Sequence, residues 1–135
     1  MTLALYCLVG WCAWAIALVL CIGAARSAQV LTGKKRPNEF PSGVPHGGDL
    51  YWRLNRAHLN TLENLPIIGA LTLVAAYTHV DITRLAEVAL AARVAQSCVH
   101  ISSGRSLAVN VRFSAYVTQL VCFILMIGRL ARHAS

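Results

Sequence analysis

The sequence predicts an all-α integral membrane protein, a single domain over residues 1–135 that forms an up-down bundle of four helices. Three observations predict this class. Of the 135 residues, 57% are hydrophobic and only 13% are charged, about half the usual share of charge in a soluble domain. The length suits one domain and no more. Uncharged stretches recur along the chain, and four spans of about 20 to 25 residues would use most of it.

The first helix is expected over residues 3–31. The 23 residues from Leu3 to Ala25 carry no charge, which is long enough to cross the hydrocarbon core. We expect this stretch to be retained and not to act as a signal peptide, because it lacks a basic start and its apolar run is too long. Residues 32–49 contain three prolines, four glycines and three consecutive basic residues, so a loop outside the hydrocarbon is expected there.

Three further helices are expected over residues 50–78, 83–103 and 108–132, joined by two short turns. Asp49 is a plausible N-cap for the second helix. Pro66 lies inside that helix, and a kink is expected there because its ring blocks the bond to the carbonyl of Leu62.

The distribution of basic residues predicts the orientation of a multi-pass protein. A net charge of +7 in a soluble domain would suggest nucleic acid, but here the basic residues lie at the ends of apolar stretches, so membrane lipids are the expected partner. Eight Lys and Arg residues lie on the side of the first and third loops, against three on the opposite side. This bias places the first and third loops in the cytoplasm, and the inner membrane is expected if the cell is bacterial. No metal site is expected, since no two of the five cysteines form a C-x-x-C pair.

Polar residues recur at helical spacing inside three of the apolar helices, and each set falls on one helix face. The three sets are Arg53, Arg56, Asn60 and Glu63; Arg93, Gln96, Ser97 and His100; and Arg112, Tyr116, Gln119 and Phe123. In an up-down bundle these faces reach the same depth, the cytoplasmic half of the membrane. Glu63 is the one acid available to several arginines there, so a positive surplus is expected.

Two interpretations of this polar layer stay open at the level of the residues. It could be a structural network in which Arg–Glu pairs hold the helices together. The surplus of arginines favours instead a bound anion, because the guanidinium fork binds carboxylates through two hydrogen bonds. Arg112, at a helix start, could also reach out to lipid headgroups.

The segment Arg56-Ala57-His58-Leu59-Asn60-Thr61-Leu62-Glu63-Asn64-Leu65-Pro66 resembles the R-A-H-x-N-x-x-E-x-x-P signature of the MAPEG family, the membrane-associated proteins in eicosanoid and glutathione metabolism. Other segments are similar to the prostaglandin synthase pattern of that family, in the same order: Gln29-Val30, Lys34-Lys35, His46-Gly47-Gly48, Ala92-Arg93-Val94-Ala95, Val111-Arg112 and Tyr116. The resemblance covers nearly the whole chain.

The resemblance implies a homotrimer with glutathione bound between neighbouring subunits in the cytoplasmic half of the membrane. Arg112 matches the arginine that stabilises the glutathione thiolate and is the expected catalytic residue. The residues expected to hold or line glutathione are Arg56, Asn60, Glu63, Arg93, His100, Tyr116, Gln29 and Lys35. The implied function is a glutathione-dependent transferase or peroxidase, in which the thiolate attacks a lipophilic small molecule that arrives from the bilayer.

Four positions depart from the catalytic pattern and keep a second function open. Leu31, Leu59, His100 and Phe113 stand where catalytic members have other, polar residues that contact glutathione. A non-catalytic, lipid-binding member of the family is therefore the alternative. A small four-helix multidrug exporter fits less well, because such exporters need an acid deep in an early helix and the first helix here has none.

Overall fold

The computed structural model describes residues 2–41 and 44–134 of the chain, so residues 42–43 of the expected loop and residues 1 and 135 lie outside the described residues. Four helices make up the fold: α1 (Leu3–Leu31), α2 (Asp49–Thr78), α3 (Thr83–Ser102) and α4 (Ser106–Ala134). The predicted all-α bundle of four helices is confirmed. α4 extends two residues beyond the expected range at each end, and α2 begins one residue earlier.

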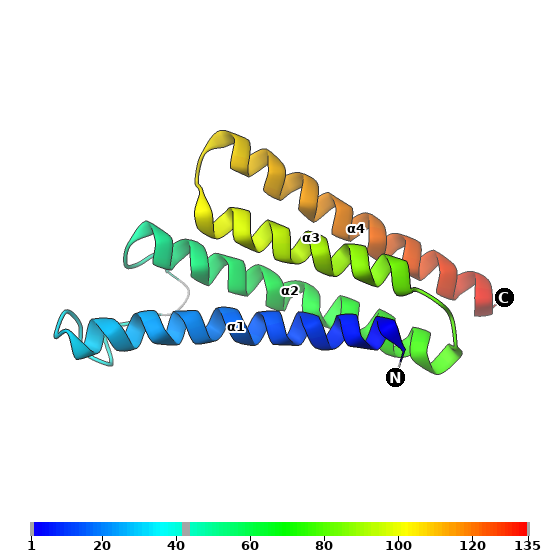
Figure 1. Cartoon of the computed structure of the whole chain (residues 1–135), viewed down its shortest axis with the longest axis horizontal. Helices are drawn as coiled ribbons and strands as arrows, with labels where there is room; N and C mark the ends of the chain where they lie inside the picture. Colours follow the sequence, from blue (N-terminus) through cyan, green and yellow to red (C-terminus); the bar gives the residue numbers. More distant parts are fainter. Residues whose placement is uncertain (1, 42–43, 135) are drawn as a thin grey trace.

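The helices run alternately up and down (Figure 1). Both chain ends and the α2–α3 turn lie at one end of the bundle, and the long α1–α2 connection lies with the α3–α4 turn at the other. The most extensive contacts join α3 to α4 and α1 to α2, while α3 also packs against α1 and α2. This arrangement brings the start of α2, the end of α3 and the start of α4 to the same end of the molecule.

Three of the helices, α1, α2 and α4, are long and apolar enough to cross a membrane. α3 falls short by composition, because Arg84, Glu87 and Arg93 interrupt its 20 residues. At about 1.5 Å per residue it still extends about 30 Å, the thickness of a hydrocarbon core. α3 is packed along the other three helices, so protein rather than lipid surrounds its most buried charge, Arg93.

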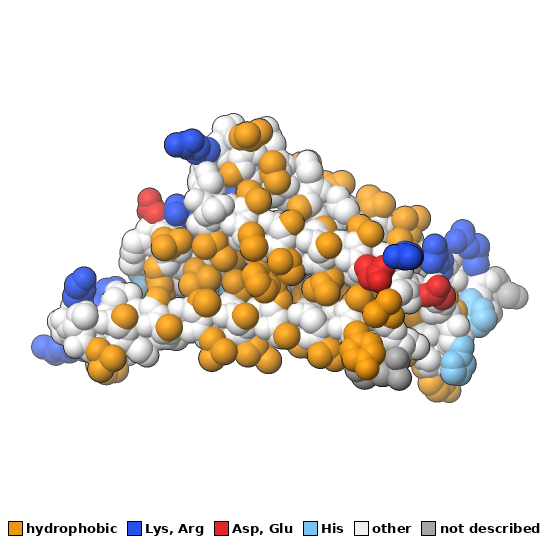
Figure 2. Space-filling view, viewed as in Figure 1, with side chains coloured by type: hydrophobic (Ala, Val, Ile, Leu, Met, Phe, Trp, Pro, Cys, Tyr) orange, Lys and Arg blue, Asp and Glu red, His pale blue; other side chains and the backbone are white. Residues whose placement is uncertain are grey.

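The surface has the polarity of a membrane protein. On the face shown in Figure 2, charged side chains gather at the two ends of the bundle, and hydrophobic side chains spread over the length between them. Large hydrophobic side chains are exposed on the spans, including Ile16, Leu73 and Ile124. An apolar surface of this extent favours lipid or another protein chain as its surroundings.

The core is centred on Trp11 of α1, whose side chain is 0% exposed. Its ring lies 6.4 Å from that of Phe123 on α4, and its indole N–H donates to the carbonyl of Thr61 on α2 at 3.1 Å. On the same helix, a Cβ at Gly10 would lie 3.0 Å from a methyl group of Leu90, so a residue without a side chain lets α1 approach α3 closely. These contacts fix α1 against all three other helices.

The ends of α2 differ in part from expectation. Gly48 is the N-cap residue and makes no side-chain cap, so the predicted capping role of Asp49 is wrong. Asp49 lies instead in the first turn, where its negative charge is favourable to the helix dipole. The helix continues through Pro66 and ends at His79, which adopts a left-handed conformation with φ 58°.

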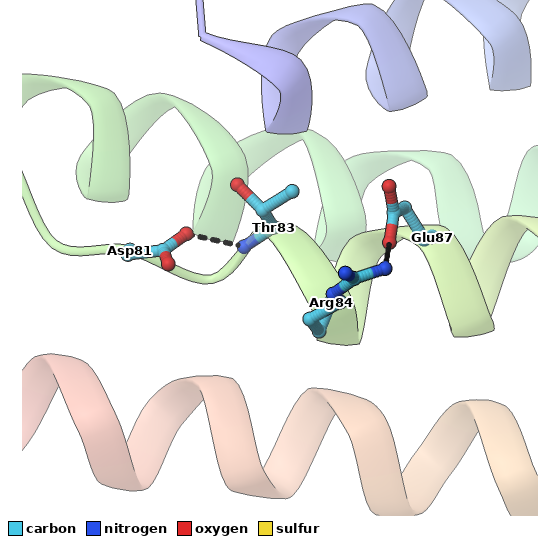
Figure 3. Close-up of polar contacts among 4 residues, drawn as sticks. All are labelled: Asp81, Thr83, Arg84 and Glu87. Atoms are coloured by element: carbon cyan, nitrogen blue, oxygen red, sulfur yellow. Dashed lines mark hydrogen bonds and ion pairs between the residues drawn. The ribbon is translucent and has the colours of Figure 1, made fainter.

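The α2–α3 turn is held by polar contacts (Figure 3). The Asp81 carboxylate accepts the backbone N–H of Thr83, the first residue of α3, at 2.9 Å, and Arg84 pairs with Glu87 at 3.1 Å. Arg129 of α4 donates to the backbone carbonyl of Asp81 at 3.0 Å. The hydrogen bonds from Thr83 hold the pKa of Asp81 below its usual range, with smaller contributions from Arg129 and Arg84.

Candidate functional site

A cavity of about 330 Å³ opens among α2, α3 and α4 in the half of the bundle that contains the α3–α4 turn. Its lining combines polar and apolar side chains: Asn60, Glu63, Asn64, Gln96, His100, Val109, Arg112, Phe113 and Tyr116. Five of the predicted site residues are therefore brought together, namely Asn60, Glu63, His100, Arg112 and Tyr116. The volume is at the lower end of the range for small-molecule sites, about 300 to 1,000 Å³.

Five of the polar side chains that line this cavity have no hydrogen-bond or ion-pair partner in the described part of the chain. Within residues 2–41 and 44–134, no hydrogen bond or ion pair satisfies the side chains of Asn60, Glu63, His100, Arg112 or Tyr116. Unsatisfied polar groups at membrane depth carry a large free-energy cost. The arrangement therefore favours a polar occupant that supplies the missing hydrogen bonds.

The electrostatic field at the cavity is positive. Arg53, Arg56 and Arg112 all lie close enough to interact electrostatically with the His100 ring. Glu63 is the only acidic residue in the lining, and it pairs with no described arginine. The interpretation of this layer as a network of Arg–Glu pairs thus receives no support from the described residues. A positive cavity with one carboxylate suits a ligand that carries several negative charges and one positive charge.

Arg112 is held through its backbone by two buried glutamines. Gln96 of α3 donates to the carbonyl of Arg112 at 3.3 Å. Gln119 of α4 in turn donates to the side-chain oxygen of Gln96 at 3.0 Å and to the carbonyl of Ala115 at 3.0 Å. This chain of hydrogen bonds fixes the first turns of α4 against α3, and so fixes the backbone from which the Arg112 side chain projects.

Arg93 is buried behind the cavity and does not line it. Its side chain is 1% exposed, and its guanidinium carbon lies 5.3 Å from the centre of the Trp11 ring. Nε and Nη2 have no hydrogen-bond partner among the described residues. Glu63 and Tyr116, which do line the cavity, interact with Arg93 electrostatically. Arg93 therefore contributes positive charge to the cavity from within the bundle.

Besides Arg93, three further predicted site residues lie outside the cavity of the single chain. Arg56 is exposed and contributes its charge without lining the cavity. Gln29 and Lys35 lie at the end of α1 and in the following loop, where Gln29 donates to the carbonyl of Ala25 at 3.2 Å. Neither contributes to the lining. Arg53 of the same polar stripe donates to the carbonyl of Ile101 at 3.0 Å, next to His100.

Sequence reasoning left four lining residues out of the predicted site. Gln96 was part of the polar stripe but was not among the expected glutathione contacts. Asn64 follows Asn60 at a helical spacing of four, so the same rule was sufficient to include it. Val109 and Phe113 are apolar and lie one turn apart at the start of α4. No polar pattern marks them. The family resemblance drew attention to Phe113 only as a departure from the catalytic pattern, and Val109 is identified only by the packing of α4 against α2 and α3.

Taken with the apolar spans, these features define an α-helical integral membrane protein with a polar, electropositive cavity inside its helix bundle. The model of the MAPEG family matches residues 4–132, and the chain belongs to this family. The predicted family is thereby confirmed, and the match takes in all four helices except the ends of α1 and α4. Among curated proteins, none matches the chain.

Proposed function

We propose that this protein is a membrane-embedded glutathione-dependent transferase or peroxidase that acts on lipophilic electrophiles or hydroperoxides. Membership of the MAPEG family supports the proposal, since the family includes both enzymes of this kind and non-catalytic members. The observation that carries it is the convergence of five polar side chains from three helices on one cavity, where none of them has a hydrogen-bond or ion-pair partner among the described residues.

The donors of the cavity fit glutathione. A peptide with two carboxylates, one ammonium group and a thiol matches a positive cavity with a single acid. In this proposal Glu63 holds the ammonium group, and Asn60 and Tyr116 donate to peptide or carboxylate oxygens. Arg93 and Arg56 add positive charge that favours the carboxylates.

Bound glutathione supplies a thiol as the nucleophile. A thiol with an ordinary pKa of about 8.5 is mostly protonated at neutral pH. The Arg112 guanidinium, half-buried at the cavity, favours the anionic form of a sulfur beside it because its charge is less screened there than in water. Gln96 and Gln119 position Arg112 by fixing its backbone.

Three further features belong to this proposal. The subunits form a homotrimer, and Gln29, Lys35 and Arg56 reach the glutathione of a neighbouring subunit. The first and third loops face the cytoplasm, because eight of the basic residues lie at that end of the bundle and three lie at the other. Lipophilic substrates enter from the bilayer along the apolar side of the cavity.

A second function is favoured by one observation. Phe113 is 67% exposed and lines the cavity, so an apolar side chain occupies part of the region that would contact glutathione. A cavity with this wall also suits a lipid with an anionic head, bound without catalysis.

Activity with the purified protein distinguishes the two functions. Conjugation of glutathione to 1-chloro-2,4-dinitrobenzene and reduction of cumene hydroperoxide test the transferase and peroxidase reactions separately. Turnover above the uncatalysed rate in either assay is the expected result. The absence of both, in protein that remains folded in detergent, would contradict the enzymatic function and favour lipid binding.

A further inference from the structure

His100 lines the cavity among α2, α3 and α4, but the proposed function gives it no role. It lies on α3, one turn beyond Gln96 and on the same helix face. Its side chain is partly buried and forms no hydrogen bond with a described residue. A neutral imidazole carries one donor and one acceptor nitrogen. His100 can therefore offer both to a molecule in the cavity.

The directions of the two helices bring the side chains of His100 and Arg112 toward each other. α3 and α4 run antiparallel (Figure 1), and side chains on a helix tilt toward its N-terminus. The Arg112 side chain therefore extends toward the α3–α4 turn, near which His100 lies, and the His100 side chain extends away from that turn. Gln96, one turn before His100, donates to the carbonyl of Arg112 at 3.3 Å. The imidazole and the guanidinium thus meet at one level of the cavity.

The charges around His100 favour a neutral ring. Three guanidinium groups interact with it electrostatically, that of Arg112 on α4 most strongly, followed by those of Arg56 and Arg53 on α2. A further positive charge beside three cations is unfavourable. The other ionisable side chains of the lining are Glu63 of α2 and Tyr116 of α4. A neutral imidazole retains a lone pair that can accept a proton.

Among the residues of the lining, Glu63 and His100 are the two that can act as bases at neutral pH. Arg112 is already protonated, and the hydroxyl and amide groups of the lining do not take up protons in this range. In the proposed function the Glu63 carboxylate holds the ammonium group of glutathione. His100 is then the lining group that remains to accept the proton of the glutathione thiol.

Binding of glutathione would itself make His100 a better proton acceptor. At neutral pH the peptide carries two carboxylates and one ammonium group, so it is an anion. Its charge offsets part of the arginine field that disfavours the imidazolium. Ionisation of the thiol adds a second negative charge close to the ring, and a thiolate and an imidazolium stabilise each other, as they do in Cys–His pairs. Proton transfer is therefore coupled to binding of the ligand.

We propose that His100 accepts the proton of the glutathione thiol, while Arg112 stabilises the thiolate. The S–H bond breaks, the proton passes to a ring nitrogen, and the electron pair stays on sulfur. With 1-chloro-2,4-dinitrobenzene the sulfur bonds to the ring carbon, chloride leaves, and His100 then releases the proton to solvent. This inference rests on the proposed glutathione site and adds a proton acceptor to it.

Counting protons during glutathione binding tests the proposal. Calorimetric titrations in buffers of different ionisation enthalpy give the number of protons released per glutathione bound. Ultraviolet difference absorbance gives the fraction of the bound thiol that ionises. S-methylglutathione, which has no thiol proton, corrects for all other proton exchange.

The wild type is compared with His100→Asn and with the matched control His79→Asn. His79 is exposed at the α2–α3 turn, at the opposite end of the bundle (Figure 1). It adopts a left-handed conformation with φ 58°, which asparagine tolerates well. The control therefore removes one imidazole without affecting the cavity.

We expect the wild type and His79→Asn to ionise bound glutathione with almost no release of protons to the buffer. In His100→Asn each thiolate that forms should release a proton, and conjugation at neutral pH should slow about a hundredfold. Release of a proton with each thiolate in the wild type would overturn the role of His100, and so would a bound thiol that stays protonated or an equal proton count in the wild type and His100→Asn. In these three cases the glutathione site itself would stand. Absence of glutathione binding to the wild type would overturn both the site and the role of His100.

Discussion

At the scale of single residues, Arg112 is the side chain on which the proposed chemistry depends most. It is the one cation in the lining of the cavity, and it has no partner among the described residues. The proposed role needs such a free guanidinium, because an arginine already paired with a carboxylate stabilises a thiolate less.

Arg112→Ala should lower the rate of glutathione conjugation at least about a hundredfold, the usual effect of removing a group that stabilises a developing or bound anion. Arg105→Ala, one turn outside the cavity and equal in charge, should leave the rate unchanged. Steady-state rates of both variants with the same electrophile provide the measurement. A rate in Arg112→Ala equal to that of the wild type would remove the proposed role.

Asp81 gives a prediction for the opposite end of the bundle. Since its folded-state pKa is depressed, its stabilisation of the α2–α3 turn is full at neutral pH and is lost as the pH falls below about 4. Asp81→Ala should therefore lower the melting temperature at pH 7, and the difference from the wild type should shrink on acidification. Thermal unfolding in detergent from pH 7 to pH 3 tests this. A difference that is constant over this range would mean that the carboxylate charge does not contribute.

The residues also show how far the sequence leads. The polar stripes contained six of the lining residues, because spacings of three and four hold on any regular helix. It did not predict that Arg93 would be enclosed behind Trp11, since that depends on where α1 packs. The predicted N-cap role of Asp49 failed because the helix begins one residue earlier than expected. The sequence rarely determines the end of a helix to a single residue.

At the scale of elements, the pairing of α3 with α4 positions the site. In the described residues, Gln119 and Gln96 form the one hydrogen bond between two side chains that joins these helices, and both are buried. The pair is linked to Arg112, because the backbone carbonyl of Arg112 accepts a hydrogen bond from the side chain of Gln96. The relative register of two elements is thus determined by a polar contact in an otherwise apolar interface.

Gln119→Leu should destabilise the fold by about 1 to 3 kcal/mol, because it leaves the buried side-chain oxygen of Gln96 without a donor. The double variant Gln96→Leu/Gln119→Leu should recover much of this loss, since neither polar partner remains to be satisfied. Unfolding in sodium dodecyl sulfate followed by circular dichroism compares them. If the free energy of unfolding lost in the double variant equals the sum of the losses in the single variants Gln96→Leu and Gln119→Leu, the two side chains do not act as a pair.

The number and order of the helices were predictable from the sequence, because uncharged runs and Pro/Gly-rich breaks mark them directly. The sequence indicated less strongly that α3 belongs to the membrane-embedded bundle. Its charges lower its hydropathy below that of a span, and only its packing among the other helices explains how it remains in the bundle. A high hydropathy marks a helix that faces lipid, whereas α3 is surrounded largely by the other helices.

At the scale of the whole molecule, the proposed trimer would resolve an imbalance in the single chain. Glu63 is exposed on an apolar span, and the cavity that it lines has polar walls from only three helices. A charge that faces lipid carries a large free-energy cost, so we expect another copy of the chain to cover Glu63. The end of α1, where Gln29 and Lys35 lie apart from the cavity, would then meet the cavity of a neighbour.

Cross-linking in intact membranes should give a covalent trimer, and the mass of the purified protein in detergent should correspond to three chains after the detergent is subtracted. We expect Glu63→Gln to leave this assembly intact, because the substitution keeps the shape of the side chain. A monomer under both conditions would contradict the proposal that a neighbouring chain completes the site.

The central claim is that the cavity among α2, α3 and α4 binds glutathione, and titration calorimetry tests it most directly. Glutathione is titrated into the purified wild type, Glu63→Gln and the control Arg105→Gln in the same detergent. The account predicts saturable binding to the wild type and to Arg105→Gln, and a loss of binding in Glu63→Gln, whose amide no longer neutralises the ammonium group. Binding that is absent from the wild type up to several millimolar, or unchanged in Glu63→Gln, would contradict it.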